Sequence, residues 1–197
     1  EYCENGCASG VCNGAGEEES WYDSTSELTW QNSKFSAALS LSSASSYCSS
    51  LTFDGYSDWR LPTISELRSL IRGCSNAETE GSCKVTDYCS SWETCTASCF
   101  SCTSGNGPSG DNNYWDSNLD GGETSLLSAT PVPGYSGYNW YIDFTTAEIS
   151  YSFDTAATNF RCVRGTMPGD TLTAPTNVTA SDGDFDNYII ISWDKVP

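Results

Sequence analysis

Eleven cysteines and no histidine in a chain of 197 residues constrain this protein more than any other feature of its sequence. A cytosolic chain rarely carries so many cysteines without a metal, because the cytosol keeps thiols reduced. The absence of histidine removes mixed Cys/His zinc sites and histidine-based catalytic triads. We therefore expect disulfides formed outside the cytoplasm. Because the count is odd, at least one thiol is free, bonds to another chain, or pairs with sequence beyond these residues.

The charge balance excludes several classes of partner. The chain has 26 acidic and 8 basic residues, which gives a net charge of −18. Such a surface repels phosphate backbones and anionic lipid head groups, so neither nucleic-acid nor membrane-surface binding is expected. No apolar run approaches the roughly 20 residues of a membrane span. No signal peptide is present at Glu1, which is typical of a mature chain or an excised segment.

The regular elements can be placed from local patterns. Residues 28–30 suggest a strand, and apolar positions between residues 36 and 51 follow a helical stripe. Thr63 and Glu66 have the spacing of a capping box, which predicts a helix from Ile64 that Gly73 ends. Residues 138–144 and 148–153 alternate like two strands joined by a turn at 145–147, and residues 160–163 suggest a last strand.

Nine of the cysteines fall in two segments without regular periodicity. Residues 1–20 hold Cys3, Cys7 and Cys12 and suggest a loop-like cap. Residues 74–102 hold six cysteines and suggest a disulfide-tied insertion. The last three of these six have the spacing of radical-SAM iron–sulfur sites, but the surroundings lack a βα-barrel pattern, so disulfides are favoured.

Several sequence blocks recur together, in the same order, in one bacterial family. They are Leu28-Thr29-Trp30-Gln31, Tyr47-Cys48, Asp58-Trp59-Arg60-Leu61-Pro62-Thr63, Gly137 to Phe144, and Arg161-Cys162-Val163-Arg164. Over roughly residues 21–165 the sequence resembles the Lcl C-terminal domain family, named for a collagen-like bacterial adhesin.

This resemblance implies an α+β, C-type-lectin-like domain, related in fold to formylglycine-generating enzymes. Such a domain has two helices, a twisted antiparallel sheet and long loops, here tied by disulfides. It also implies that Cys48 pairs with Cys162, since both lie in family blocks. Trp59, Leu61 and Pro62 are then expected to be scaffold rather than ligand contacts.

A second resemblance covers the end of the chain. Residues 174–181 and 191–194 are similar to the first two strands of a fibronectin type III domain, a β-sandwich of which only a part is present. The predicted organisation is a Cys-rich cap (1–20), the Lcl C-terminal-like domain (21–166), a linker (167–174) and the fibronectin-like strands (175–197).

A loop in the second half resembles half of a calcium-binding motif. Asp116, Asn118 and Asp120 precede Gly121 with the spacing D-x-[DN]-x-[DN]-G, but Leu127 occupies the position of the distal glutamate. Glu123 could serve only in a different loop geometry. The pattern fits either a Ca²⁺ site built from Asp116, Asn118, Asp120 and Glu123 or an ordinary Asn/Asp/Gly turn. The sugar-binding signatures of calcium-dependent lectins, Glu-Pro-Asn and Trp-Asn-Asp, are absent.

Aromatic residues in the loop-rich second half predict a contact surface. We expect Tyr114, Trp115, Tyr135 and Tyr138 to contact a ligand, with core packing as the alternative. Carboxylates such as Asp111 and Asp116 do not form a recognisable catalytic set, and Cys162 is better used in a disulfide than in formylglycine-type chemistry. No catalytic residues and no certain cofactor are therefore predicted.

The resulting hypothesis is a non-catalytic adhesion or ligand-binding module, secreted or on the surface of a bacterium, that recognises a glycan or protein on another surface. The adhesin for which the family is named is linked to sulfated glycans, which need a basic face. The net charge of −18 departs from this, so that ligand is not carried over. The alternative is a structural subunit of an extracellular filament or matrix, a homo-oligomer joined through the C-terminal strands and inter-chain contacts.

Overall fold

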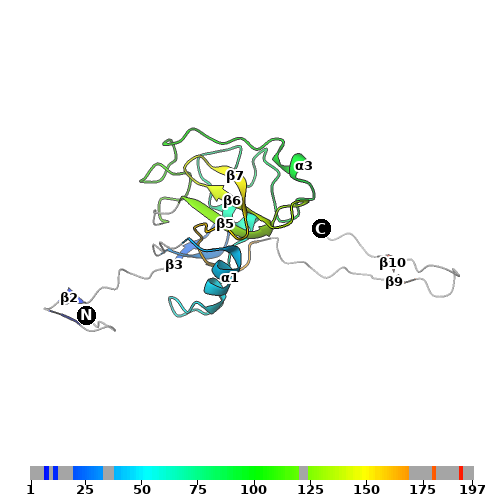
Figure 1. The fold of residues 1–197 in the computed structure, drawn as a ribbon. Coiled ribbons are helices and arrows are strands. Elements are labelled where there is room, and N and C mark those ends of the chain that lie inside the picture. Colours follow the sequence, from blue (N-terminus) through cyan, green and yellow to red (C-terminus); the bar gives the residue numbers. More distant parts are fainter. Residues whose placement is uncertain are drawn as a thin grey trace. The chain divides into compact units, whose positions relative to one another are not determined.

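The computed structural model describes residues 20–32, 38–119 and 124–168, and the two-residue strands at 7–8, 11–12, 179–180 and 191–192. The chain divides into two compact units, Glu1–Gly165 and Thr166–Pro197. Most of the predicted cap, linker and fibronectin-like segment lies outside the described residues. Within them the first unit is a mixed α/β structure with small antiparallel sheets (Figure 1).

The first sheet brings the two ends of this unit together. It contains β3 (Ser20–Asp23), β4 (Leu28–Gln31) and β8 (Val163–Arg164), in the order β3-β4-β8. Trp30 on β4 lies opposite Val163, so the segment that ends the unit pairs with the strand near its start. The predicted last strand thus begins three residues later than expected. Ahead of this sheet, β1 (Cys7–Ala8) pairs with β2 (Val11–Cys12).

The second sheet contains β5 (Ser125–Pro131), β6 (Tyr138–Asp143) and β7 (Glu148–Phe153), in that order. The predicted hairpin of residues 138–153 is confirmed, with Tyr138 opposite Phe153 and Asp143 opposite Glu148. The Asp143 carboxylate accepts hydrogen bonds from Thr145 N at 2.9 Å and Thr145 Oγ1 at 2.7 Å, and so closes the turn. β7 forms one edge of this sheet, with β6 as its only partner among the described strands.

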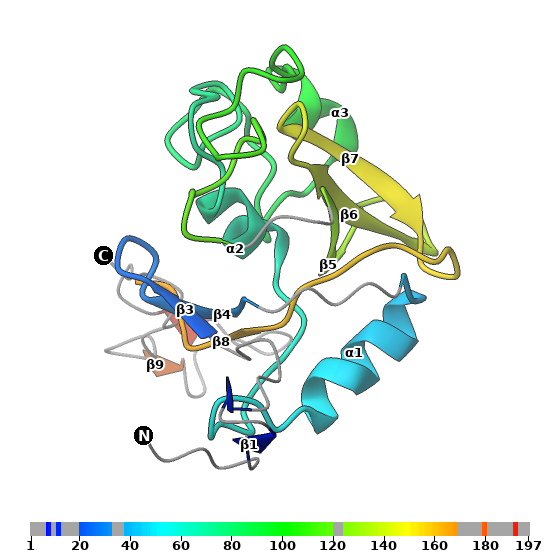
Figure 2. The ribbon, with the colours of Figure 1, turned by 90° about the vertical axis from the view of Figure 1, so that its left-hand side faces the viewer.

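The described residues form three helices. α1 (Leu41–Ser50) is shorter than the predicted stripe, and α3 (Trp92–Thr96) was not predicted. α2 (Ile64–Ser69) begins after Thr63 as expected, but it ends at Ser69, before the predicted end at Gly73. The capping box is confirmed, because Thr63 Oγ1 accepts from Glu66 N and the Glu66 carboxylate accepts from Thr63 N. Figures 1 and 2 show α3 close to β7. α1 begins near the far end of β7, where Leu41 N donates to Asp154 O at 2.9 Å, directly after the strand.

One part of the core surrounds the Cys48–Cys162 disulfide, which has a sequence separation of 114. This is the pair that the family resemblance implied. Both sulfurs belong to fully buried residues, and the bond joins α1 to the segment before β8. The buried neighbours include the predicted scaffold residues Trp59 and Leu61, together with Ala44, Phe53, Leu127 and Phe160.

The predicted disulfide-tied insertion is confirmed, and its three bonds are nested. Cys74–Cys102 encloses Cys83–Cys99, which in turn encloses Cys89–Cys95. We refer to residues 74–102 as the insertion. It lies between α2 and β5 in the chain, and Cys102 N donates to Thr146 O at 2.7 Å, which fixes its end to the β6–β7 turn.

The second unit is described only in part. β9 (Thr179–Ala180) pairs antiparallel with β10 (Ile191–Ser192). These residues fall in the two segments expected to be fibronectin-like strands, whose remaining positions lie outside the described residues.

Among the described residues, no helix has the length and apolar character needed to cross a membrane.

Candidate functional site

One face of the β6–β7 hairpin carries aromatic side chains in register. Tyr138 lies opposite Phe153, and Trp140 lies opposite Tyr151. Because side chains alternate between the two faces of a strand, these four share one face of the sheet. The ring centroids of Tyr138 and Phe153 are 4.3 Å apart, and those of Tyr138 and Tyr151 are 5.3 Å apart. The hairpin therefore presents a contiguous row of rings.

Two further rings join this face from outside the hairpin. Trp92, the first residue of α3, stacks on Trp140 with centroids 5.0 Å apart and meets Tyr151 edge-on at 4.7 Å. Tyr135, in the turn between β5 and β6, lies parallel to Tyr151 at 6.3 Å. Trp140 is fully buried. We use the name aromatic surface for the remaining five rings, Trp92, Tyr135, Tyr138, Tyr151 and Phe153.

The aromatic surface is open to solvent. Tyr135 is 44% exposed, Tyr151 is 43% exposed and Phe153 is 56% exposed, while Trp92 and Tyr138 are half-buried. Single exposed rings are common on proteins, but contiguous exposed apolar groups mark interaction sites. The arrangement is therefore suited to contact with a ligand.

Trp92 is held in place by the innermost disulfide of the insertion. Cys89 and Cys95, three residues before and three residues after Trp92, are bonded to each other. Within α3, Cys95 N donates to Ser91 O at 3.1 Å and Thr96 Oγ1 donates to Trp92 O at 2.8 Å. A ring fixed before binding loses less conformational freedom when a ligand arrives, which favours affinity.

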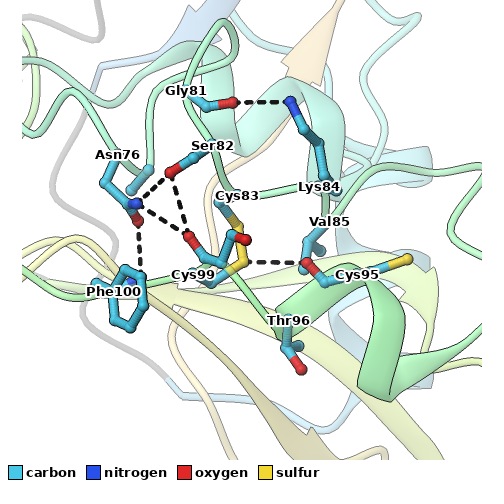
Figure 3. The surroundings of a disulfide bond; sticks show 12 residues. Asn76, Gly81, Ser82, Cys83, Lys84, Val85, Cys95, Thr96, Cys99 and Phe100 are labelled. Atoms are coloured by element: carbon cyan, nitrogen blue, oxygen red, sulfur yellow. Dashed lines mark hydrogen bonds between the residues drawn. A yellow bond between two sulfur atoms is a disulfide. The ribbon is translucent and has the colours of Figure 1, made fainter.

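The Cys83–Cys99 bond positions the next part of the insertion (Figure 3). Beside this bond, Asn76 connects both ends of the insertion: its Nδ2 donates to Ser98 O at 2.9 Å, and its Oδ1 accepts from Phe100 N at 2.7 Å. The main chain of Phe100 is thus fixed while its ring is 66% exposed.

A pocket of about 320 Å³ adjoins the aromatic surface, between the insertion and the outer edge of β7. Two rings of the aromatic surface, Trp92 and Tyr151, form part of its wall, and the exposed ring of Phe100 adds a third. The remaining wall is made by Ala77, Thr96, Cys99, Ser101, Ala147, Glu148, Ile149 and Ser150.

The charged groups around this pocket are acidic. Glu148 belongs to its wall, and the wall contains no lysine or arginine. Glu93, next to Trp92 in α3, has its pKa held below the usual value by hydrogen bonds from its own backbone N–H and from Ser91 Oγ at 2.8 Å. Lys84, in the insertion, donates instead to Gly81 O at 3.1 Å.

The structure separates the four predicted contact residues into two pairs. Tyr135 and Tyr138 lie together on the aromatic surface, with ring centroids 6.3 Å apart. The expected exposure of Tyr114 and Trp115 is wrong, because these side chains are only 3% and 0% exposed.

Tyr114 and Trp115 are scaffold residues for a physical reason. Tyr114 Oη donates to Thr103 O at 2.8 Å, and the Trp115 ring packs on Phe144 at 5.2 Å. The loop that carries them is drawn against the sheet, where Tyr114 N donates to Phe144 O at 2.7 Å. The apolar surfaces of Tyr114 and Trp115 therefore pack within the protein core and cannot contact a ligand.

The predicted calcium residues are described only in part. Asp116 Oδ1 accepts from Asn118 N at 2.9 Å and from Asn118 Nδ2 at 2.8 Å, which is the geometry of an Asx turn. Asp116 Oδ2 is 3.9 Å from Arg72 Nε. Asp120 and Glu123 lie outside the described residues. Within the described part of the chain, no three Cys, Asp or Glu side chains are grouped so as to hold a metal ion.

Three members of the aromatic surface were not predicted: Trp92, Tyr151 and Phe153. A signal for the last two exists, because the expected turn at 145–147 pairs residues 148–153 with 138–144 and places Tyr151 and Phe153 beside Trp140 and Tyr138. Trp92 has no such signal. Its position follows from disulfides within a segment that has no apolar period.

Comparison with known proteins agrees with the family resemblance of the sequence blocks between Leu28 and Arg164. The model of the Lcl C-terminal domain family matches residues 19–164, which is most of the chain. Neither a curated protein nor a solved structure gave a significant match. On the strength of the family match, this chain belongs to the Lcl C-terminal domain family.

Proposed function

We propose that this protein is an extracellular ligand-binding or adhesion module of a bacterial surface protein. The observation that carries the proposal is the aromatic surface, a contiguous group of five exposed or half-buried rings. The paired strands of the hairpin carry three of the rings, and a disulfide holds the helix that carries Trp92. Aromatic side chains supply large contact area at low entropic cost, and they dominate the energetics of many interfaces. Rings provide contact rather than a nucleophile with its base, so we propose recognition without catalysis.

The proposed location follows from the disulfides. Four bonds among the described residues are consistent with a protein that matures in an oxidising compartment. A net charge of −18 favours solubility there and disfavours nucleic acid as a partner.

We further propose that residues 21–166 adopt a C-type-lectin-like arrangement and that a fibronectin type III unit follows. Support for the first comes from the pairing of β8 with β4 and from the long disulfide-tied loop between α2 and β5, which presents Trp92. Support for the second is the antiparallel pair β9–β10. Tandem modules of this kind are typical of surface proteins.

The proposal can be tested on an array that carries glycans and extracellular-matrix proteins. The labelled full chain is expected to bind at least one class of ligand, and a Tyr135→Ala/Tyr151→Ala/Phe153→Ala variant is expected to lose that binding. Tyr22→Ala is the matched control, because Tyr22 is 57% exposed on β3, in the other sheet. Binding that survives in the triple variant would exclude the aromatic surface as the recognition site.

Thermal unfolding of the protein with and without a chelator tests the calcium prediction at Asp116, Asn118, Asp120 and Glu123. If calcium stiffens this loop, the chelator lowers the thermal stability of the protein. A thermal unfolding curve that the chelator leaves unchanged would contradict a calcium site.

One observation favours a second candidate, a structural subunit of a filament or matrix. Cys3, Cys7 and Cys12 lie outside the four described disulfides, and three cysteines cannot all pair with one another. A bond between chains would use the remaining thiol. Non-reducing electrophoresis and mass photometry distinguish the candidates, since a filament subunit gives covalent multimers and a binding module gives monomers.

A further inference from the structure

We propose that the pocket between the insertion and β7 binds a sugar unit of a glycan that carries neither sulfate nor carboxylate. This inference rests on the proposed ligand-binding function and specifies the chemistry of the ligand. Four properties of the pocket support it: its rings, its polar edge, its charge and its size.

The rings of the pocket fit the apolar face of a pyranose. Trp92 and Tyr151 meet edge-on with centroids 4.7 Å apart, so their planes form two differently oriented walls. Phe100, on the insertion, contributes a third ring that is 66% exposed and available to a ligand. A sugar ring presents C–H groups on one face, and these pack on aromatic carbons while water is released from both.

The polar part of the pocket is the free edge of β7. The wall includes four consecutive residues of β7, Glu148, Ile149, Ser150 and Tyr151. Because successive side chains of a strand point to opposite faces, four consecutive residues can line the pocket only if the main chain also faces it. On its outer side β7 has no partner strand among the described elements, which leaves backbone N–H and C=O groups open to a ligand. Such neutral donors and acceptors suit sugar hydroxyl groups.

The charge of the pocket excludes anionic sugars. Sulfates and carboxylates are recognised by arginine or lysine, or by several convergent N–H donors. The wall contains Glu148 and no basic side chain, and the carboxylate of Glu93 lies in α3 beside Trp92. An anionic ligand would meet these charges at short range as well as a net charge of −18.

The size of the pocket favours a sugar over a peptide strand added to β7. Its volume of about 320 Å³ is near the lower end of small-ligand pockets, which run from about 300 to 1,000 Å³. Cys99, Phe100 and Ser101 form the wall on the insertion side, where disulfides hold the chain. An extended peptide would have to displace this wall, whereas one sugar ring fits within it.

The test uses the full chain with its disulfides intact and three probes: cellotriose, tri-N-acetylchitotriose and a heparin-derived hexasaccharide. Saturation-transfer NMR detects binding, and calorimetric titration at low salt gives Kd. At least one neutral trisaccharide is expected to bind about tenfold or more tightly than the sulfated probe. Tyr151→Ala and Phe100→Ala are each expected to weaken it by about three- to tenfold.

Matched controls are Tyr22→Ala and Tyr88→Ala, which remove rings that are 57% and 71% exposed outside the pocket and should leave Kd unchanged. Because Phe100 and Tyr151 are exposed, the folding of both variants can be verified by unchanged thermal unfolding. The inference would be overturned if the heparin hexasaccharide bound as tightly as the neutral trisaccharides or more tightly. It would also be overturned if neither Tyr151→Ala nor Phe100→Ala changed the Kd of a neutral trisaccharide. If no sugar binds but the aromatic variants abolish binding to an immobilised protein, the inference falls and the proposed function stands.

Discussion

Among single residues, Arg68 connects the helical scaffold to the insertion. Its side chain, on α2, is 2% exposed and donates to four backbone carbonyl oxygens. Burial lowers its pKa to about 10, so the guanidinium stays charged at neutral pH. The five N–H groups of arginine allow this many simultaneous bonds, which lysine could not make. The carbonyls belong to Ala77, Glu78, Cys83 and Val85, at distances of 2.6 to 3.1 Å.

Replacement of Arg68 by alanine is expected to lower the free energy of unfolding by about 3 kcal/mol, because several buried carbonyl oxygens lose their donor. The measurement is guanidinium unfolding with disulfides intact. Lys84→Ala is the control, since Lys84 donates to one carbonyl from an exposed position and should cost less than about 0.5 kcal/mol. Similar losses in the two variants would contradict the role given to Arg68.

For single residues, hydrogen bonds between neighbours in the sequence could be predicted, but the burial or exposure of a loop side chain could not. The Thr63–Glu66 capping box could be predicted because both partners lie within one helical turn. The residues next to Tyr114 and Trp115 in the sequence are those of an exposed loop. Both side chains are nevertheless buried, because Tyr114 N donates a hydrogen bond to Phe144 O and holds the loop against the sheet. That bond joins positions distant in sequence, and no local pattern encodes it.

At the level of elements, the β6–β7 hairpin could be predicted and β5 and α3 could not. The hairpin alternates clearly on both strands around a short turn. β5 contains adjacent leucines, a register shift after Leu127 and a proline at its end, so it lacks a period of two. α3 has five residues, too few for a helical stripe, and it depends on the surrounding disulfides.

The disulfides are expected to differ in their contribution to stability. Cys48–Cys162 has a sequence separation of 114 and Cys89–Cys95 one of 6. Chain-entropy arguments give about 5 kcal/mol for the first and about 2 kcal/mol for the second. The burial of Cys48 and Cys162 adds to the loss of stability expected when their bond is removed. Guanidinium unfolding of C48A/C162A and C89A/C95A measures the free energy of unfolding that each variant loses. A smaller loss from C48A/C162A would contradict this ranking.

For the whole molecule, cysteine usage and charge were the most informative features of the sequence. Eight of the eleven cysteines are bonded within the described residues, in agreement with the expectation of an oxidised chain. The family could be recognised because its blocks occur in order along most of the chain. The position of the candidate site could not, since it depends on how the insertion folds back over β7.

Thiol titration tests this assignment directly. Eleven cysteines less the eight in disulfides leave Cys3, Cys7 and Cys12, so the native, unreduced protein should react with no more than three equivalents of a thiol reagent. Denaturation with a reductant should raise the count to eleven. More than three reactive thiols before reduction would show that the described bonds do not form in solution.

The nested order of the three bonds in the insertion also bears on how the chain matures. Cysteines 6, 16 and 28 positions apart are joined one inside another, with no crossing. Oxidation can therefore proceed outward from the shortest span, and each closure shortens the free chain that the next closure must span. The three bonds of the insertion can therefore form without one part of the chain passing through a closed loop. They can also form before or after the Cys48–Cys162 bond, whose partners lie outside the insertion.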